Sequence, residues 1–317
     1  MNDAEGVANK GDSNRLKDYL LLIKPSLSIM VVFSSVISYL LAPKVVSYNW
    51  QMILLLFAGG MLVTGSANAI NQVVEKDTDA IMKRTAKRPM AAGRMSIAEG
   101  WAFAIFTGIA GILILGIYFN WLSAGLAAFS LFLYAFIYTP LKKVSAIAVL
   151  MGAVPGALPC LIGWAAGDDQ LSFGGWVLFA IQFLWQFPHF WAIAWVAHKD
   201  YSNAGFKLLP GEEGPTKFTA LQTIIYSLLL IPVGMIPYYI GMSDIVSLVI
   251  VLVTNLFLVI QCIRLYREMN VKAARRVMFS SYIHLPVVLL ALLMDKIPPT
   301  PEGGLGGIFK IVHSVFV

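Results

Sequence analysis

Charged side chains are scarce in this chain: Asp, Glu, Lys and Arg make up 13% of its 317 residues, and apolar types make up 58%. A soluble globular domain has about 25% charged residues, so this composition and the mean hydropathy of +0.76 exclude that class. There are two cysteines, Cys160 and Cys262, without CxxC spacing, and we expect buried thiols. The polar N-terminal stretch lacks the apolar core of a cleavable signal peptide, so we expect residues 1–20 to form a flexible cytoplasmic tail.

The apolar residues are gathered into long runs. Crossing the ~30 Å hydrocarbon core of a lipid bilayer takes about 17–25 apolar residues in a helix, and nine segments meet this length. Three closely spaced pairs among them predict antiparallel helices joined by tight turns. We therefore predict an all-α membrane protein, a single polytopic domain over residues 1–317 with nine transmembrane helices. The nine segments are 26–42, 51–70, 98–118, 121–138, 145–164, 172–192, 218–239, 242–263 and 277–294.

The basic residues predict the orientation of these helices. With the N-terminus inside, 20 of the 23 Lys and Arg residues lie on the inner side, and only Lys44, Lys296 and Lys310 lie outside. Basic residues concentrate in cytoplasmic loops, so we expect an N-in, C-out protein of the cytoplasmic (inner) membrane. The net charge of +6 is then partly a topology signal and does not indicate a nucleic-acid partner.

One inner segment, NQVVEKDTDAIMKRTAKRP at 71–89, holds eight charges in nineteen positions. Asn71, Glu75 and Asp79 recur every fourth residue, so on an α-helix they drift by only ~40° per step and share one face. We expect them to continue the second apolar helix past the inner interface and to point into a cavity between helices. Two carboxylates and an amide oxygen suit Mg²⁺, which shares phosphate oxygens with such ligands.

The second half of this segment is basic. Arg offers a planar fork to phosphate oxygens and Lys a compact charge, so acids followed by bases predict a diphosphate site that faces the cytoplasm. For the bases alone, a solvated loop with charges paired at the surface explains the sequence equally well. The bases are Lys83, Arg84, Lys87 and Arg88, and Pro89 ends any helix after them.

The whole segment resembles the first signature of the UbiA-type intramembrane prenyltransferases, Asn-xxx-Asp-xxx-Asp followed by Arg-Thr-xx-Arg-Pro. The departure is Glu75 at the middle acid, which keeps the charge and lengthens the side chain. The resemblance implies a helical bundle with nine transmembrane helices and a cavity open to the cytoplasmic side. It also implies that Asn71, Glu75 and Asp79 hold Mg²⁺, which bridges to an isoprenyl diphosphate, and that the bases hold the diphosphate.

A second inner loop, YTPLKKVS at 138–145, is similar to the family's Tyr-Thr-xx-Lys-Arg loop. The resemblance implies that Lys142 and Lys143 face the diphosphate from the opposite wall. Tyr138 is expected to orient an oxygen or to stabilise a cation through its ring face. The Lys-Pro opening of the first apolar segment also recurs in the family, but we interpret Lys24 as an interfacial anchor.

The stretch FLWQFPHFWAIAWVAHKDYSNAGFKLLP at 183–210 departs from most of the family, which has a second Asp-rich motif here. His189 stands where the first Asp would fall, and Asp200 remains where the motif ends. The pattern Trp-Gln-x-Pro-His-Phe, then Lys-Asp-Tyr, then Ala-Gly and Leu-Pro, resembles one branch, the protohaem farnesyltransferases. The resemblance extends from Lys24 to Pro210, and this stretch is its most specific part.

The branch implies electrophilic alkylation, with farnesyl diphosphate and protohaem IX as substrates and Mg²⁺ as the cofactor. An allylic cation forms as the C–O bond breaks, a vinyl group of protohaem captures it, and water adds to give the side chain of haem O. Asp200 is a candidate ligand for a second ion from across the cavity. A membrane partner that modifies haem or assembles an oxidase is a further expectation.

Two histidines are candidates for haem contact. A lone His in an apolar helix is as often a hydrogen-bonded packing residue as a functional one. For His189 the functional alternatives are contact with the haem iron or a propionate, and proton handling. His284, in the last apolar segment, is the weaker candidate.

Two other functions stay open. A prenyltransferase on the same scaffold would act on an aromatic quinone precursor or chlorophyllide, but the missing second Asp cluster and WQFPHF argue against this. An ion-coupled secondary transporter would use Glu75 and Asp79 for coupling. Transporter acids usually lie near the bilayer midplane, whereas these two follow the inner end of an apolar run.

Overall fold

The computed structural model describes residues 15–211 and 214–298, and within these ranges all regular structure is helical apart from one isolated bridge. A short helix, Arg15–Ile23, comes first. The elements that follow are α2 (Pro25–Leu41), α3 (Trp50–Val74), α4 (Lys76–Ile81), α5 (Ile97–Tyr118), α6 (Trp121–Phe132), the π-helical turn η1 (Leu133–Tyr138), α7 (Thr139–Leu141), α8 (Ala148–Asp168), α9 (Phe173–Val196), α10 (His198–Asn203), α11 (Lys217–Tyr239), α12 (Ile245–Glu268) and α13 (Val271–Met294).

Eight helices in the described ranges are long and apolar enough to cross a membrane, with α6, η1 and α7 counted as one span over Trp121–Leu141. The helix Arg15–Ile23 and α2 meet at a bend of 44°, and they add a ninth span if the pair is counted as one. The chain is therefore a multi-pass integral membrane protein, as predicted. Residues 15–20, which we expected in a flexible tail, are helical, and the rest of that expected tail lies outside the described residues.

Side-chain caps explain where several helices begin. Asn49, Ser96, Asn120 and Asn270 each accept a hydrogen bond from a backbone N–H in the first turn of the helix that follows. Such caps satisfy donors that have no partner inside the helix. The starts predicted at 51, 98 and 121 lie within one residue of the observed helix starts, whereas α13 begins at Val271, six residues before the predicted start at 277.

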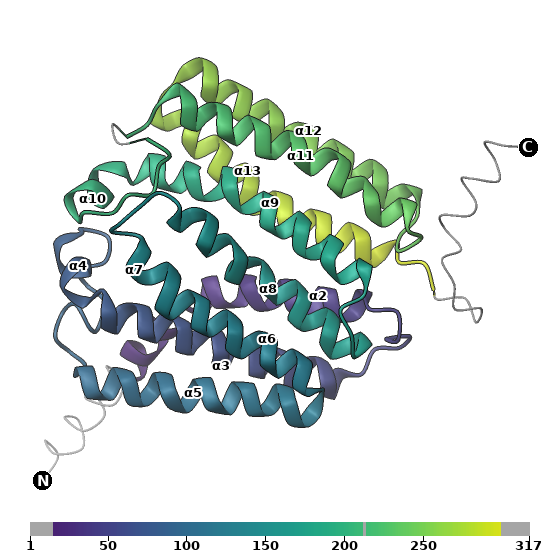
Figure 1. The fold of residues 1–317 in the computed structure, drawn as a ribbon, viewed down its shortest axis with the longest axis horizontal. Helices are drawn as coiled ribbons and strands as arrows, with labels where there is room; N and C mark the ends of the chain where they lie inside the picture. Colours follow the sequence, from purple (N-terminus) through teal and green to yellow (C-terminus); the bar gives the residue numbers. More distant parts are fainter. Residues whose placement is uncertain (1–14, 212–213, 299–317) are drawn as a thin grey trace, which may run out of the picture.

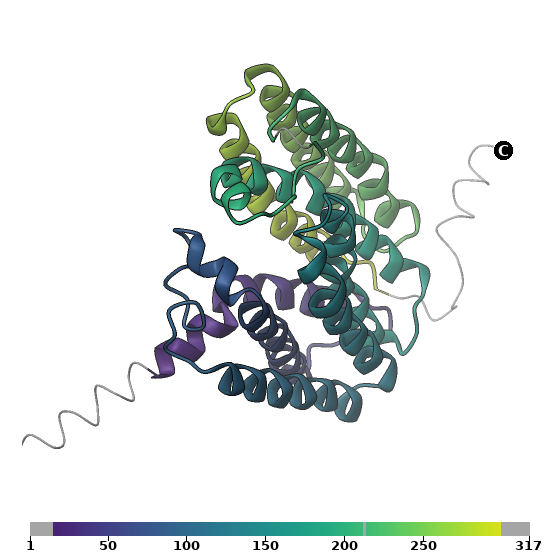
Figure 2. The same cartoon turned by 60° about the vertical axis from the view of Figure 1, so that its left-hand side comes forward.

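The helices form two groups that meet at α2 and α8 (Figures 1 and 2). In the first group, α3 packs on α2 and α5, and α6 packs on α5 and α8; in the second, α9 packs on α8, α11 and α13, with α12 between α11 and α13. Helix α13, the last helix of the described ranges, also packs against α2. The contact between α2 and α8 is close because Gly163 faces the backbone oxygen of Ser35, where a Cβ atom would collide.

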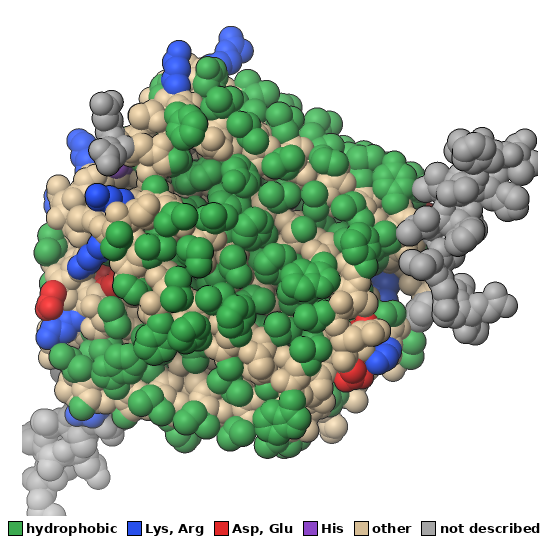
Figure 3. All heavy atoms as spheres, in the orientation of Figure 1, with side chains coloured by type: hydrophobic (Ala, Val, Ile, Leu, Met, Phe, Trp, Pro, Cys, Tyr) green, Lys and Arg blue, Asp and Glu red, His purple; other side chains and the backbone are tan. Residues whose placement is uncertain are grey.

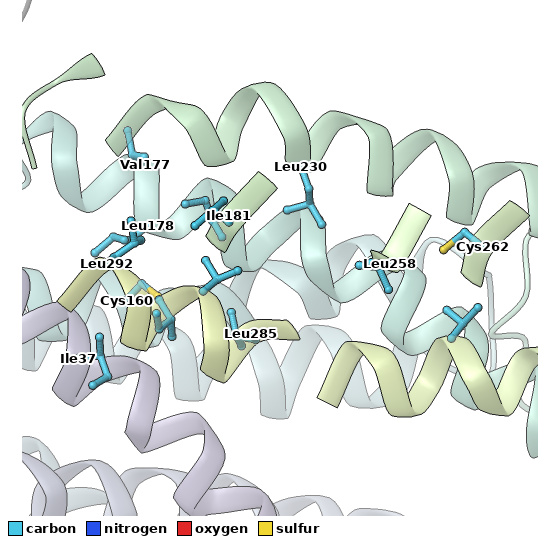
Figure 4. Close-up of a cluster of buried hydrophobic side chains, with 14 of the residues drawn as sticks. Ile37, Cys160, Val177, Leu178, Ile181, Leu230, Leu258, Cys262, Leu285 and Leu292 are labelled. Carbon is cyan, nitrogen blue, oxygen red and sulfur yellow. The ribbon is translucent and has the colours of Figure 1, made fainter. Parts of the chain in front are cut away.

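The largest apolar core lies in the second group and reaches α2 (Figure 4). It contains Cys160 and Cys262, both buried and free, which confirms the prediction of buried thiols.

The face drawn in Figure 3 is broadly apolar, and its Lys, Arg, Asp and Glu side chains lie towards the two ends of the helices. One end holds the connections that contain α4, α7 and α10. The opposite end has only Lys44 and Lys296 as basic residues within the described ranges. Lys296 donates to the backbone oxygens of Leu40, Ala42 and Val45 and so caps the end of α2. The candidate site lies at the basic end.

Candidate active site

Asn71, Glu75 and Asp79, here called the acidic stripe, lie where α3 ends and α4 begins. Helix α3 ends at Val74 and Glu75 interrupts it, yet Glu75 N donates to Asn71 O (2.9 Å) and Asp79 N donates to Glu75 O (2.7 Å). The four-residue spacing is therefore preserved across the break. Asn71, Glu75 and Asp79 are all buried, with exposed fractions of 3%, 6% and 1%.

Each buried carboxylate faces a base. Arg88 Nη1 donates to both oxygens of Asp79, at 2.8 and 2.7 Å, and Lys142 forms an ion pair with Glu75. Burial lowers the pKa of Lys142 below its ordinary value, and the charge of Glu75 opposes this shift. Lys142 comes from the connection after α7, so it reaches Glu75 from a segment separate from α3 and α4.

Asn71 shows an unfilled hydrogen-bonding capacity. Lys24 Nζ lies 3.5 Å from its Oδ1, while Nδ2 is buried and has no hydrogen-bond partner among the described residues. A buried unpaired donor costs about 1–3 kcal/mol, so this amide is suited to an acceptor such as a phosphate oxygen. Lys24 adopts a left-handed conformation (φ 49°) at the bend before α2, a backbone arrangement that is costly outside glycine.

Aromatic rings surround Lys142. Its Nζ lies 4.9 Å from the ring centre of Tyr138 and 5.4 Å from that of Phe206, both within cation–π range. Gly152 of α8 lies directly against the Tyr138 ring, where a Cβ would approach to 2.6 Å. The ring of Tyr138 is thus held between α8 and the Lys142 ammonium group.

A second contact connects the segment after α4 to α10; α4 and α10 lie at the same end of the bundle (Figures 1 and 2). Arg84 Nη2 donates to Tyr201 Oη at 3.1 Å, and its guanidinium group lies 5.7 Å from the centre of that ring. Met82 packs with Phe206 beside this contact. The basic segment after α4 therefore contacts α10 through Arg84 and Tyr201.

The remaining predicted residues of this end are more open. Lys83, Lys87 and Lys143 are exposed, and Asp200 is half-buried. No hydrogen bond or ion pair engages the Asp200 side chain in the described part of the chain, which also contains no group of three or more His, Cys, Asp or Glu side chains placed to hold a metal. The two carboxylates of the stripe, on Glu75 and Asp79, form ion pairs with Lys142 and Arg88.

A pocket of about 430 Å³ lies beside Tyr201 and Phe206 at this end of the bundle. His198, Lys207, Ser145 and Ser202 line it together with those two rings. Asn71, Glu75 and Asp79 are not among the residues that line this pocket, so the pocket and the acidic stripe are separate features.

Both candidate histidines are buried and hydrogen-bonded. His189 Nδ1 lies 2.8 Å from Ser281 Oγ, and His284 Nε2 lies 2.6 Å from Asn255 Oδ1. Asn255 Nδ2 donates to Leu230 O, so His284 connects α13 to α12 and α11. That arrangement is typical of a packing histidine.

Three participants were missed or underrated from the sequence. Tyr201 lies in the Lys-Asp-Tyr motif but was given no role, and Ser281 had no motif that pointed to it; their contacts with Arg84 and His189 identify them. Lys24 did have a signal, the Lys-Pro opening, but its contact with Asn71 goes beyond the interfacial anchor that we expected.

Comparison with known proteins gives consistent results. Residues 31–283 match the profile of the UbiA prenyltransferase family. The chain is 44% identical to the protoheme IX farnesyltransferase of Cytophaga hutchinsonii, over 90% of this chain and 99% of that protein. It is 35% identical to the mitochondrial protoheme IX farnesyltransferase of Arabidopsis thaliana, over 88% of this chain and 65% of that protein.

Solved structures show the same fold. A digeranylgeranylglyceryl phosphate synthase superposes with a TM-score of 0.74 at 20% identity, covering 89% of this chain and 98% of that one. A UbiA homologue from Archaeoglobus fulgidus bound to GPP and Mg²⁺ gives a TM-score of 0.63 at 13% identity, covering 87% of this chain and 99% of that one. The all-α bundle described above is therefore UbiA-like, and the chain belongs to the UbiA prenyltransferase family.

Proposed function

We propose that this protein transfers the farnesyl group of farnesyl diphosphate to a vinyl group of protohaem IX, giving haem O. The observation on which this rests is the buried Asn71–Glu75–Asp79 stripe faced by bases from separate walls. The relatives named protoheme IX farnesyltransferase, at 44% and 35% identity, support the choice of substrates.

The stripe fits a magnesium ion by its chemistry. Carboxylate and amide oxygens are the hard donors that Mg²⁺ prefers, and burial at 6% and 1% exposure removes Glu75 and Asp79 from competing water. We assign Asn71, Glu75 and Asp79 as ligands, with Asp200 as a ligand for a second ion. When bound, Mg²⁺ neutralises charge on the diphosphate as the C–O bond breaks.

The bases bind the leaving diphosphate. Arg88 and Lys142 lie next to the stripe, and Lys83, Arg84, Lys87 and Lys143 extend the positive surface towards solvent. The unpaired Nδ2 of Asn71 is a further donor for a phosphate oxygen. The π face of Tyr138, already placed against a cation, would stabilise the allylic cation before the vinyl carbon attacks it.

The location of the reaction follows from the charge distribution. We assign nine spans, N-in and C-out, in the cytoplasmic (inner) membrane, so that the basic end of the bundle faces the cytoplasm. The farnesyl tail then lies among the apolar helices, and the acceptor reaches the cation away from bulk water. A membrane partner that takes up haem O would fit this location.

The test is transfer of radiolabelled farnesyl diphosphate by the purified protein with Mg²⁺, with protohaem IX and an aromatic quinone precursor offered together. Label in the porphyrin supports the proposal, and Asp79→Asn should abolish it while membrane insertion is kept. Label in the quinone precursor alone would show that the acceptor is wrong. Unchanged transfer by Asp79→Asn would remove Asp79 from the site.

A further inference from the structure

The hydrogen bonds of His189 determine which ring nitrogen carries its proton. His189 Nδ1 lies 2.8 Å from Ser281 Oγ, and Ser281 Oγ donates to Met278 O at 2.7 Å. A hydroxyl group has one hydrogen, and that hydrogen is engaged with Met278 O. Ser281 therefore accepts from His189, so Nδ1 carries the proton and Nε2 presents a bare lone pair.

This lone pair is accessible. Nε2 of His189 has no hydrogen-bond partner in the described ranges, and it is not among the unpartnered polar atoms that are fully enclosed. The residue keeps 8% of its surface exposed. An incoming group can therefore reach Nε2, although the residue as a whole is buried.

The ring is also held in a fixed orientation. Trp185 stacks on it at 4.5 Å between ring centres with an interplanar angle of 18°, and Tyr282 meets it edge-on at 5.0 Å. Trp185 in turn donates from Nε1 to the backbone oxygen of Ser281 at 2.9 Å. Helices α9 and α13 thus aim the Nε2 lone pair in one direction.

The surroundings favour a neutral imidazole. The aromatic and hydrogen-bonding partners of the ring, from both α9 and α13, are Trp185, Phe190, Ser281 and Tyr282, and none is charged. An imidazolium formed here by proton uptake would be a buried charge without a counter-ion, which is costly. A neutral lone pair whose other ring nitrogen donates a hydrogen bond is the arrangement of a metal-ligating histidine.

We propose that His189 Nε2 is an axial ligand of the iron of the haem acceptor. This inference rests on the proposed function, in which protohaem is the substrate. Ligation of the iron by an oriented imidazole would fix the plane and position of the macrocycle. The reacting vinyl group would then be presented to the farnesyl cation in one pose.

The chain offers a matched control in His284. It is also buried in the bundle, but its Nε2 is used by Asn255 and its Nδ1 is fully enclosed. Each histidine can be replaced by the amide that keeps its existing hydrogen bond. His189→Asn retains a donor near the Nδ1 position, and His284→Gln retains one near the Nε2 position.

The experiment adds protohaem IX alone to the purified wild type and variants and records optical and electron paramagnetic resonance spectra. Wild type and His284→Gln should show a histidine-ligated haem, and His189→Asn should lose that signature. Ser281→Ala should keep the ligand but weaken haem binding by about tenfold or more. In His189→Gly, added imidazole should restore the wild-type spectrum, which separates lost ligation from misfolding.

The inference is wrong if His189→Asn keeps the wild-type spectrum and haem affinity, or if imidazole does not restore the spectrum of His189→Gly. Farnesyl transfer measured in the same wild-type preparation separates this failure from that of the proposed function. If farnesyl is transferred to haem but the haem spectrum does not depend on His189, the assignment of His189 as the ligand is wrong and the proposed function stands. A wild type that neither binds haem nor transfers farnesyl to it overturns both.

Discussion

The ion pair between Glu75 and Lys142 allows stability and activity to be separated. Both side chains are buried, with 7% and 8% of their surfaces exposed. Removing one partner leaves the other as an uncompensated buried charge, whereas removing both leaves none. We consider Lys142→Met, Glu75→Met and the double variant, because methionine approximates the length of both side chains.

The single and double variants are expected to differ in how much they lower the free energy of unfolding. Breaking a buried pair by removal of one partner typically costs about 3–5 kcal/mol, while replacing both partners with apolar side chains is often neutral. Each single variant should therefore unfold at a clearly lower temperature, and the double variant should recover most of that loss. Farnesyl transfer should be absent in all three, because Glu75 is assigned to the metal and Lys142 to the diphosphate.

The assay combines thermal unfolding in detergent with transfer of labelled farnesyl to protohaem. Lys143→Met is the control for stability, since Lys143 is the exposed neighbour of Lys142 and its loss should change the free energy of unfolding by less than about 0.5 kcal/mol. A Lys142→Met protein as stable as wild type would refute the buried pair. A double variant with wild-type turnover would refute the assignment of both residues to the site.

Other predictions concern the second ion pair, the packing and the metal. Arg88→Lys keeps the positive charge but loses the planar guanidinium group and the N–H donors that the Asp79 contact leaves free. We therefore expect kcat/KM for farnesyl diphosphate to fall by about tenfold, or ~1.4 kcal/mol; an unchanged value would show that the guanidinium group is not needed. Gly163→Ala places a methyl group on the Ser35 backbone and should destabilise the protein by about 1–3 kcal/mol, whereas Gly125→Ala, with open space around it, should be neutral or slightly stabilising in the same unfolding measurement. Chelation of divalent cations by EDTA should abolish transfer and Mg²⁺ should restore it, while full activity in EDTA would exclude the metal.

The sequence predicted the fold well because the bilayer constrains it strongly. A span needs a long apolar run, and eight of the nine predicted runs overlap the eight helices that could cross a membrane, while the run at 26–42 overlaps α2, which follows the bend. The bend at Lys24 was not predicted, because a left-handed residue before proline has no clear signature in one sequence. The break at Glu75 was also missed, since helix propensity does not show where a polar segment will interrupt a helix.

The periodicity of the sequence predicted which residues of one segment share a face of the site. It did not predict contacts between segments that lie far apart in the chain. The spacing of Asn71, Glu75 and Asp79 predicted a shared stripe, and all three are buried together at one end of the bundle. The contact between Arg84 and Tyr201, by contrast, joins residues 117 positions apart and depends on how α4 and α10 pack. The hydrogen bond that fixes the tautomer of His189 spans 92 positions and needed the structure for the same reason.

The most direct test of the central claim is an anomalous diffraction map of the protein crystallised with Mn²⁺ and an unreactive analogue of farnesyl diphosphate. The account predicts a manganese peak next to the oxygens of Asn71, Glu75 and Asp79, with the diphosphate in contact with Arg88 and Lys142. A manganese peak remote from these side chains, or a diphosphate bound elsewhere while Glu75 and Asp79 keep their ion pairs, would contradict it.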